Sequence, residues 1–121
     1  MIQTIAHVSL LVSDTERALR FYREVLGLSV DDNRPDLGYP GAWLGVGEQQ
    51  IHLLELPTHD PVEGRPEHGG RDRHTAFNVS DVENLAESLE KNGITYTRSR
   101  SGRNALFCRD FDGNALEFIE V

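Results

Sequence analysis

The chain has 121 residues, of which 38% are hydrophobic and 26% charged, which is the size and composition of one soluble globular domain. Twelve basic and twenty acidic residues give a formal net charge of −8, which disfavours a nucleic-acid partner. The sequence has no apolar run long enough for a membrane span, no signal-peptide pattern and a single cysteine, Cys108. We therefore expect a cytoplasmic protein without an internal disulfide or a membrane contact.

One short pattern occurs twice. Residues 5–14 read "IAHVSLLVSD" and residues 72–81 read "DRHTAFNVSD". Aligning His7 with His74 also aligns the Val-Ser-Asp that ends each stretch. Such self-similarity indicates an internal duplication.

The first copy predicts a strand over residues 6–12 and a helix from about Thr15 to Val25, which Gly27 ends. Ser13 and Glu16 have the spacing of a capping box at the helix start. Three strand-like runs follow, "LSV", "GAWLGV" and "QQIHLLEL". The first half therefore predicts a βαβββ module over residues 1–57.

A segment rich in proline and glycine, about residues 58–72, predicts a linker. His59 and His68 lie in it, and we expect both to be exposed to solvent. The second copy repeats the order of elements over residues 73–121, with a capping box at Ser80 and Glu83 and a helix over Val82–Lys91. The runs "ITYT", "NALFCRD" and "ALEFIEV" complete it. The prediction is one α+β domain of two βαβββ modules.

Strand alternation predicts where the candidate ligands point. Apolar residues at alternate positions form the helix-covered face of each strand, so His7 and His52 in the first module point to the opposite, open face. In the second module the same alternation turns His74 and Glu117 to the open face. A slip of one residue in the fourth strand would replace His52 by Glu55.

Three imidazoles and one carboxylate are a donor set that suits a divalent first-row metal. Taken singly, each of these residues is more simply a polar residue on a solvated face. Two ligand-type residues in each half, at equivalent places in the duplication, favour the metal site.

The sequence resembles the vicinal oxygen chelate superfamily, which includes glyoxalase I, extradiol dioxygenases, and fosfomycin- and bleomycin-resistance proteins. The resemblance rests on "HVSLLVSDTERALRFYREVLGL", "HTAFNVSD" and "RDFDGNALEFIEV" and covers essentially the whole chain. It implies two modules that form a cupped mixed sheet around one divalent ion (Ni, Zn, Mn, Co or Fe), with His7, His52, His74 and Glu117 as ligands. It also implies a homodimer. Where this chain has His52, glyoxalase I has Glu or Gln, which leaves Glu117 as the one carboxylate base.

A turn between two strands of the second module carries candidate substrate ligands. Arg98, Arg100 and Arg103 would clamp a carboxylate or phosphonate there, or form a solvated hairpin tip. Ser101 resembles a phosphonate ligand of the fosfomycin enzymes. Trp43 is a candidate pocket wall or a core residue. Cys108, flanked by strand residues, is predicted to be a packing residue and not a nucleophile.

Three functions fit these features. The first is a metal-dependent lyase, isomerase or thiol transferase of the glyoxalase or fosfomycin-resistance type, acting on a small, oxygenated, anionic substrate with a thiol cosubstrate. The second is an iron(II) dioxygenase that uses His7, His74 and Glu117. The third is a bleomycin-resistance-type binding protein without catalysis. Fold alone does not choose among them.

Overall fold

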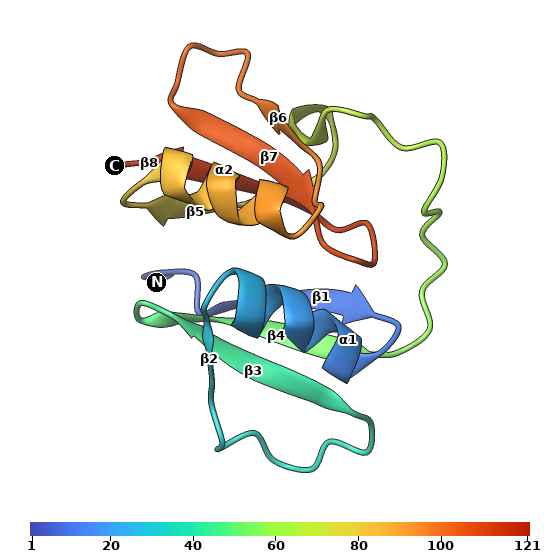
Figure 1. Cartoon of the computed structure of the whole chain (residues 1–121). Helices are drawn as coiled ribbons and strands as arrows, with labels where there is room; N and C mark the ends of the chain where they lie inside the picture. The colour runs from blue at the N-terminus through green and yellow to red at the C-terminus, as the bar shows by residue number, and fades with distance from the viewer. The chain divides into compact units, whose positions relative to one another are not determined.

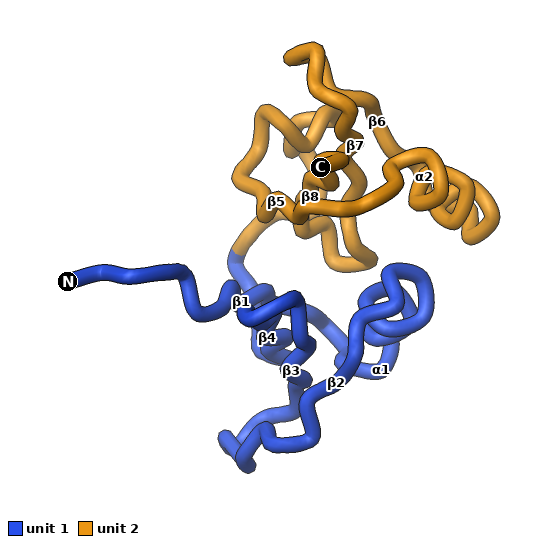
Figure 2. The backbone as a smooth tube through the Cα atoms, turned by 90° about the vertical axis from the view of Figure 1, so that its left-hand side faces the viewer, with its two compact units in different colours: residues 1–59 blue, residues 60–121 orange.

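The computed structural model describes residues 1–121, and the chain divides into two compact units, residues 1–59 and 60–121 (Figure 2). The boundary lies in the segment that the sequence predicts as a linker. Each unit contains a strand, a helix and three further strands in that order (Figure 1). The predicted α+β class and the repeated βαβββ order are confirmed. No helix has the length and apolar character needed to cross a membrane.

The first unit is a four-stranded mixed sheet with a helical segment on one face. Its elements are β1 (His7–Val12), α1 (Thr15–Leu19), the π-helical turn η1 (Arg20–Val25), β2 (Ser29–Val30), β3 (Gly41–Val46) and β4 (Gln49–Glu55). The spatial order is β1-β4-β3-β2, in which β1 is parallel to β4 and the other neighbours are antiparallel.

The second unit repeats this arrangement. Its elements are the short 3₁₀ turn η2 (Gly69–Arg71), β5 (His74–Val79), α2 (Val82–Lys91), β6 (Tyr96–Arg98), β7 (Ala105–Arg109) and β8 (Ala115–Glu120). The spatial order is β5-β8-β7-β6, and only β5 and β8 are parallel. The two units therefore have the same topology.

The sheet face under each helix carries the core. In β4, Ile51 and Leu53 are 3% and 1% exposed, whereas His52 between them lies on the other face and is partly exposed. In β8, Leu116 and Phe118 are buried in the same way against α2. Each of these side chains contributes about 2 kcal/mol by leaving water, which fixes the direction in which the intervening residues point.

Both helices begin on an aspartate, so the predicted serine capping boxes are wrong. Asp14 Oδ1 accepts a hydrogen bond from Arg17 N at 2.9 Å, and Asp81 Oδ1 accepts one from Asn84 N at 3.0 Å. Both aspartates have extended backbone conformations directly before the first helical residue. The serine of each Ser-Asp pair is one residue too early to reach these amides, and a carboxylate also complements the helix dipole.

The first helix ends where the sequence predicts but changes type on the way. After Leu19 the chain forms a π-helical turn, in which Leu26 N donates to Phe21 O at 2.9 Å. The wider turn brings the adjacent residues Phe21 and Tyr22 both into the core, where each is 0% exposed. A regular α-helix would place two neighbouring residues about 100° apart and bury one ring less completely.

Replacement of Asp81 by alanine is expected to lower the free energy of unfolding by about 1 kcal/mol, because the Asn84 amide loses its acceptor at the helix start. Ser80→Ala, one residue earlier, is the matched control and should change stability by less than about 0.5 kcal/mol. Urea unfolding of both variants measures the difference. Equal destabilisation of the two would restore the serine capping box.

Candidate metal and substrate site

In the second unit, the parallel pairing of β5 with β8 brings His74 next to Glu117. His74 pairs with Ala115 and Glu117 with Ala76, so the two side chains are diagonal neighbours on one face. His74 Nε2 lies 3.2 Å from Glu117 Oε1. The imidazole is 27% exposed and the carboxylate only 3%. Two of the predicted ligands therefore lie within contact distance of each other, one partly exposed and the other buried.

The other oxygen of Glu117 is bound by an arginine. Arg103 Nη2 donates to Oε2 at 3.0 Å, and the Arg103 side chain itself is 56% exposed. Burial of a carboxylate costs several kcal/mol unless charged or polar groups replace its water. His74 and Arg103 supply these groups, one at each oxygen.

The His74 ring is held in one orientation. Its Nδ1 donates to the carbonyl oxygen of Asp72 at 2.8 Å, and because a carbonyl only accepts, the ring proton is on Nδ1. The Asp72 carboxylate accepts from Arg65 Nε and from Arg109 Nη1, both at 2.8 Å. These bonds lower the pKa of Asp72 to about 2, with Arg109 as the largest cause. This ion cluster fixes the backbone on which His74 depends.

In the first unit, three rings stack across neighbouring strands. His7 and His52 have ring centroids 3.9 Å apart with planes at 13°, and Trp43 stacks on His52 at 4.4 Å and 6°. His52 is therefore enclosed between an imidazole and an indole. The two predicted ligands of this unit share the open face of its sheet.

A hydrogen-bonded chain orients His52. Gln50 Nε2 donates to Asp31 Oδ2 at 2.8 Å, and its amide oxygen accepts from His52 Nε2 at 2.8 Å. Burial is the largest cause of a lowered pKa of His52, followed by the positive charges of His7 and Arg34, whereas Asp31 raises it. His52 is accordingly a neutral imidazole at pH 7 with its lone pair on Nδ1.

The strand registers show that the two pairs are equivalent. His52 pairs with Ser9, two residues after His7, just as Glu117 pairs with Ala76, two residues after His74. On the adjacent strands, Trp43 is opposite His52 and Phe107 is opposite Glu117. Each unit thus contributes two ligand-type residues and one aromatic ring from corresponding positions. The union of the two pairs around one ion stays a prediction.

The alternative ligand Glu55 lies elsewhere. Its Oε1 accepts from Thr15 N at 2.7 Å, so its side chain is at the start of α1, on the helix side of the sheet. No register slip occurs, and His52 holds the position on the open face.

The arginine turn is divided between two faces. Arg98 forms a two-point ion pair with Glu83 of α2, with nitrogen–oxygen distances of 2.8 and 3.1 Å, and so points toward the helix. Arg103 reaches Glu117 and also Ser101, whose hydroxyl accepts from Arg103 Nε at 3.3 Å. Arg100 is exposed on the same loop. Of the predicted substrate ligands here, Ser101 and Arg103 are the two linked to the His74–Glu117 pair.

Comparison with known proteins assigns this arrangement to a family. The sequence model of the Glyoxalase/Bleomycin resistance protein/Dioxygenase superfamily matches residues 4–118. The chain belongs to this superfamily. Lactoylglutathione lyase from Haemophilus influenzae is 33% identical over 124 residues, which cover 96% of this chain and 91% of that enzyme.

Solved glyoxalase-family structures have the same fold. A glyoxalase family protein from Bacillus anthracis superposes with a TM-score of 0.81 at 27% identity, over 99% of this chain and 96% of that one. A variant of the fosfomycin resistance protein FosX from Listeria monocytogenes, in complex with Mn(II) and dihydroxypropylphosphonic acid, has a TM-score of 0.77 at 17% identity and covers 99% of this chain and 93% of its own. At 17% identity, the similarity to FosX shows a shared fold.

The second-unit pair of this glyoxalase-superfamily protein fits a divalent metal. If two ligand atoms are each about 2.1 Å from an ion and the ligand–ion–ligand angle is about 90–110°, the two atoms lie about 3.0–3.4 Å apart. His74 Nε2 and Glu117 Oε1 are 3.2 Å apart. Because Nδ1 donates to the Asp72 carbonyl, Nε2 is the ring nitrogen that faces the carboxylate, and a metal ion held by this pair would bind Nε2 and Oε1. A backbone carbonyl on the remote nitrogen is also typical of metal-binding histidines.

Several functional candidates were not found from the sequence, and the prediction for His68 was wrong. His68 is only 8% exposed, whereas His59 is exposed as expected. Gln50, Asp31 and Thr97 have no repeat partner or motif that would identify them. For His68 the signal was available in principle, because two glycines directly follow it and permit close packing.

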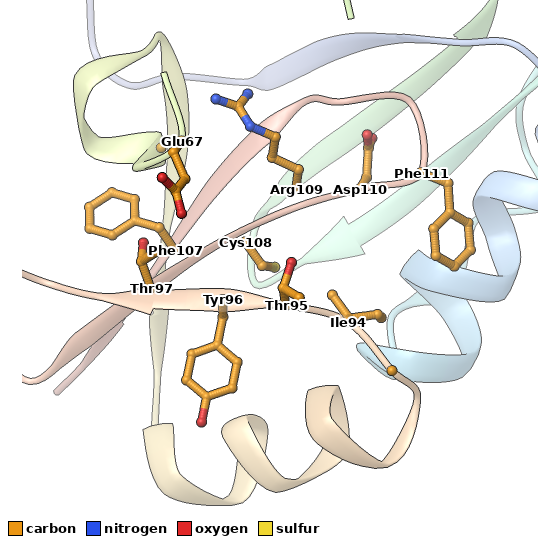
Figure 3. Close-up of a pocket in the computed structure, with 12 residues that line it drawn as sticks. Glu67, Ile94, Thr95, Tyr96, Thr97, Phe107, Cys108, Arg109, Asp110 and Phe111 are labelled. Atoms are coloured by element: carbon orange, nitrogen blue, oxygen red, sulfur yellow. The ribbon is translucent and has the colours of Figure 1, made fainter. Parts of the chain in front are cut away.

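A cavity of about 410 Å³ lies in the second unit, along β6 and the end of β7 (Figure 3). Thr97 and Phe107 line it, together with Glu67 from the segment before β5. Tyr96, between the two threonines of the strand, points away toward α2, where its hydroxyl bonds Glu90.

Cys108 is a packing residue, as predicted. It is 4% exposed, and burial raises the pKa of its thiol to about 12. A thiol with this pKa is protonated at neutral pH and is not a nucleophile.

Replacement of Asp72 by asparagine is expected to lower the free energy of unfolding at pH 7 by about 2 kcal/mol, because the native pKa is depressed from 3.8 to about 2. A carboxylate with a lowered native pKa stabilises the fold above its unfolded pKa and loses that contribution as the pH falls toward 2. The difference between variant and wild type should therefore shrink between about pH 4 and pH 2. Urea titrations across this range measure it.

Asp60→Asn is the matched control, since this carboxylate is 51% exposed and pairs with the exposed Arg73. It should change stability by less than about 1 kcal/mol. A pH-independent difference for Asp72→Asn would contradict the ion-cluster explanation.

Proposed function

We propose that this protein is a divalent-metal-dependent enzyme of the glyoxalase type, with His7, His52, His74 and Glu117 as the ligands of one ion. The proposed reaction is a lyase or isomerase step on a small, oxygenated, anionic substrate, foremost the glutathione hemithioacetal of a 2-oxoaldehyde. The observation that carries the proposal is the His74–Glu117 contact, in which Nε2 and Oε1 lie 3.2 Å apart beside a carboxylate that is only 3% exposed. The similarity to lactoylglutathione lyases supports the substrate class.

When bound, the ion would polarise a substrate oxygen and stabilise the negative charge that develops on it. In this proposal Glu117 accepts and returns a proton, and its burial on the open face beside His74 supports that role. Arg103 is long, half-exposed and attached to a loop, so its guanidinium can turn from Glu117 to an anionic group of the substrate. Trp43 and Phe107 supply the two aromatic walls.

The proposed set of four metal ligands can be tested through Trp43, the one tryptophan of the chain. Because its indole stacks on His52 at 4.4 Å, Co(II) or Ni(II) bound to that imidazole should quench the tryptophan fluorescence. We expect saturation at one ion per chain. His7→Ala and Glu117→Gln should each weaken binding by more than the roughly 10–100-fold typical of losing an outer-shell partner.

The control for this titration is His59→Ala, which removes an exposed histidine of the linker and should leave the curve unchanged. Metal content measured by mass spectrometry accompanies each titration. A full complement of metal with no change in fluorescence would remove His52 from the ligand set, and unchanged affinity in Glu117→Gln would overturn the site.

Turnover is tested with metal-loaded protein on a panel of substrates: the glutathione hemithioacetal of methylglyoxal, a 2-oxo acid, and an epoxide phosphonate with a thiol. We expect the hemithioacetal to react, and Glu117→Gln to lower kcat by about 10²-fold or more at saturating metal. Glu87→Gln makes the same chemical change at an exposed position of α2 and should leave kcat as it is. No turnover on the panel would reject the enzyme, and oxygen consumption with catechols after iron loading would favour the dioxygenase.

A further inference from the structure

Gln50 has both ends of its side-chain amide engaged in hydrogen bonds. It lies in β4 two residues before His52, on the same face of the strand, and stands opposite His7 on β1. Its Nε2 donates to Asp31 Oδ2 at 2.8 Å, and its Oε1 is 2.8 Å from His52 Nε2. The amide therefore connects a carboxylate to one of the proposed metal ligands.

Asp31 decides which way round this amide is held. Directly after β2, its Oδ1 accepts from the backbone amide of Asn33 at 2.9 Å, and its own N–H donates to the carbonyl oxygen of Trp43 at 2.8 Å. The backbone bond from Asn33, as the largest cause, and the bond from Gln50 lower the pKa of Asp31. Asp31 is thus an ionised carboxylate, which only accepts hydrogen bonds. The Gln50 nitrogen has to face it, so the Gln50 oxygen faces His52.

The consequence for His52 is a fixed tautomer. An amide oxygen only accepts, so Nε2 of the neutral ring carries the proton and Nδ1 keeps the lone pair. The stacked rings of His7 and Trp43 cover the two faces of the imidazole, with centroids 3.9 and 4.4 Å away. A ligand can approach only the edge of the ring, and Gln50 occupies that edge at Nε2. Nδ1 is the nitrogen that remains.

The duplication shows that this amide is specific to the first unit. The strand registers place Ala115 of the second unit at the position equivalent to Gln50. The second unit also has the carboxylate Glu117 where the first has His52. A carboxylate presents two equivalent oxygens and needs no control of its tautomer, whereas an imidazole does. The orienting amide therefore occurs in the unit whose ligand at this position is an imidazole.

We propose that Gln50 and Asp31 are positioning residues of the metal site, which make His52 bind the divalent ion through Nδ1. This inference rests on the function proposed above, in which His52 is a ligand. His74, whose Nδ1 donates to a backbone carbonyl, presents the opposite nitrogen, Nε2. The two histidines thus bind one ion through different ring atoms. The negative charge of Asp31, one amide away, makes Nδ1 of His52 a more basic ligand.

Long-range ¹H–¹⁵N NMR of the imidazoles tests the tautomer without metal or turnover. We expect His52 to carry its proton on Nε2 in the wild-type protein. Gln50→Leu removes the acceptor and should leave both tautomers populated. Asp31→Asn should do the same, because an asparagine amide can donate as well as accept and allows the Gln50 amide to turn over. Gln49→Leu and Asp32→Asn, at exposed neighbouring positions, are the matched controls and should leave His52 unchanged.

The same variants are then titrated with Zn(II). We expect Gln50→Leu to weaken binding by about 10–100-fold, which is typical of losing an outer-shell partner, and Asp31→Asn to weaken it less. In the Zn(II)-loaded wild-type protein, the ¹⁵N resonances should show the metal on Nδ1 of His52, with Nε2 still protonated, and on Nε2 of His74. Urea unfolding of each variant separates a loss of affinity from a loss of fold.

Two results would overturn this inference and leave the four ligands in place. One is Zn(II) bound to Nε2 of His52, and the other is a Zn(II) affinity of Gln50→Leu within about threefold of the Gln49→Leu control. A wild-type protein that binds no Zn(II), or binds it without a change in the His52 resonances, would instead reject the proposed ligand set, and with it the role of Gln50 and Asp31.

Discussion

The organisation of the second unit depends on one buried carboxylate. Glu117 is 3% exposed on the face of the sheet that carries no helix, where a glutamate would ordinarily be solvated. Such a group is stable only if charged or hydrogen-bonding partners replace its water, and His74 and Arg103 do so at its two oxygens. In the proposed function, a metal ion would bind between His74 and Glu117, and a substrate anion would draw Arg103 away from the carboxylate.

Structural ion pairs hold the elements that position this carboxylate. Asp72, clamped by Arg65 and Arg109, fixes the backbone carbonyl that orients His74. Directly after Arg109, at the same end of β7, the buried Asp110 accepts from the backbone amides of Asp112 and Asn114, both at 2.9 Å, and closes the turn into β8. The turn sets the β7–β8 register, which places Phe107 opposite Glu117. Asp110 of the "DFDGN" motif thus serves the fold by closing this turn.

The duplication made the sheets and the two pairs predictable, because strand alternation and repeat spacing act over many residues. Features set by a single residue were less accessible. The helix caps are the aspartates, one residue after the predicted serines. The direction of the Arg98 side chain depends on a strand of only three residues. His68 was misjudged because it lies in a segment with no periodicity and no repeat partner. Its burial follows from contacts with Thr97 and Phe107, which are distant in sequence.

The difference between the two units has a consequence for charge. The first unit offers two imidazoles, and the second offers one imidazole and one carboxylate. A divalent ion held by such a set would keep one net positive charge, whereas a second carboxylate at position 52 would cancel it. Such a residual positive charge, next to Arg103, would strengthen the attraction for an anionic oxygen in a chain whose net charge is −8.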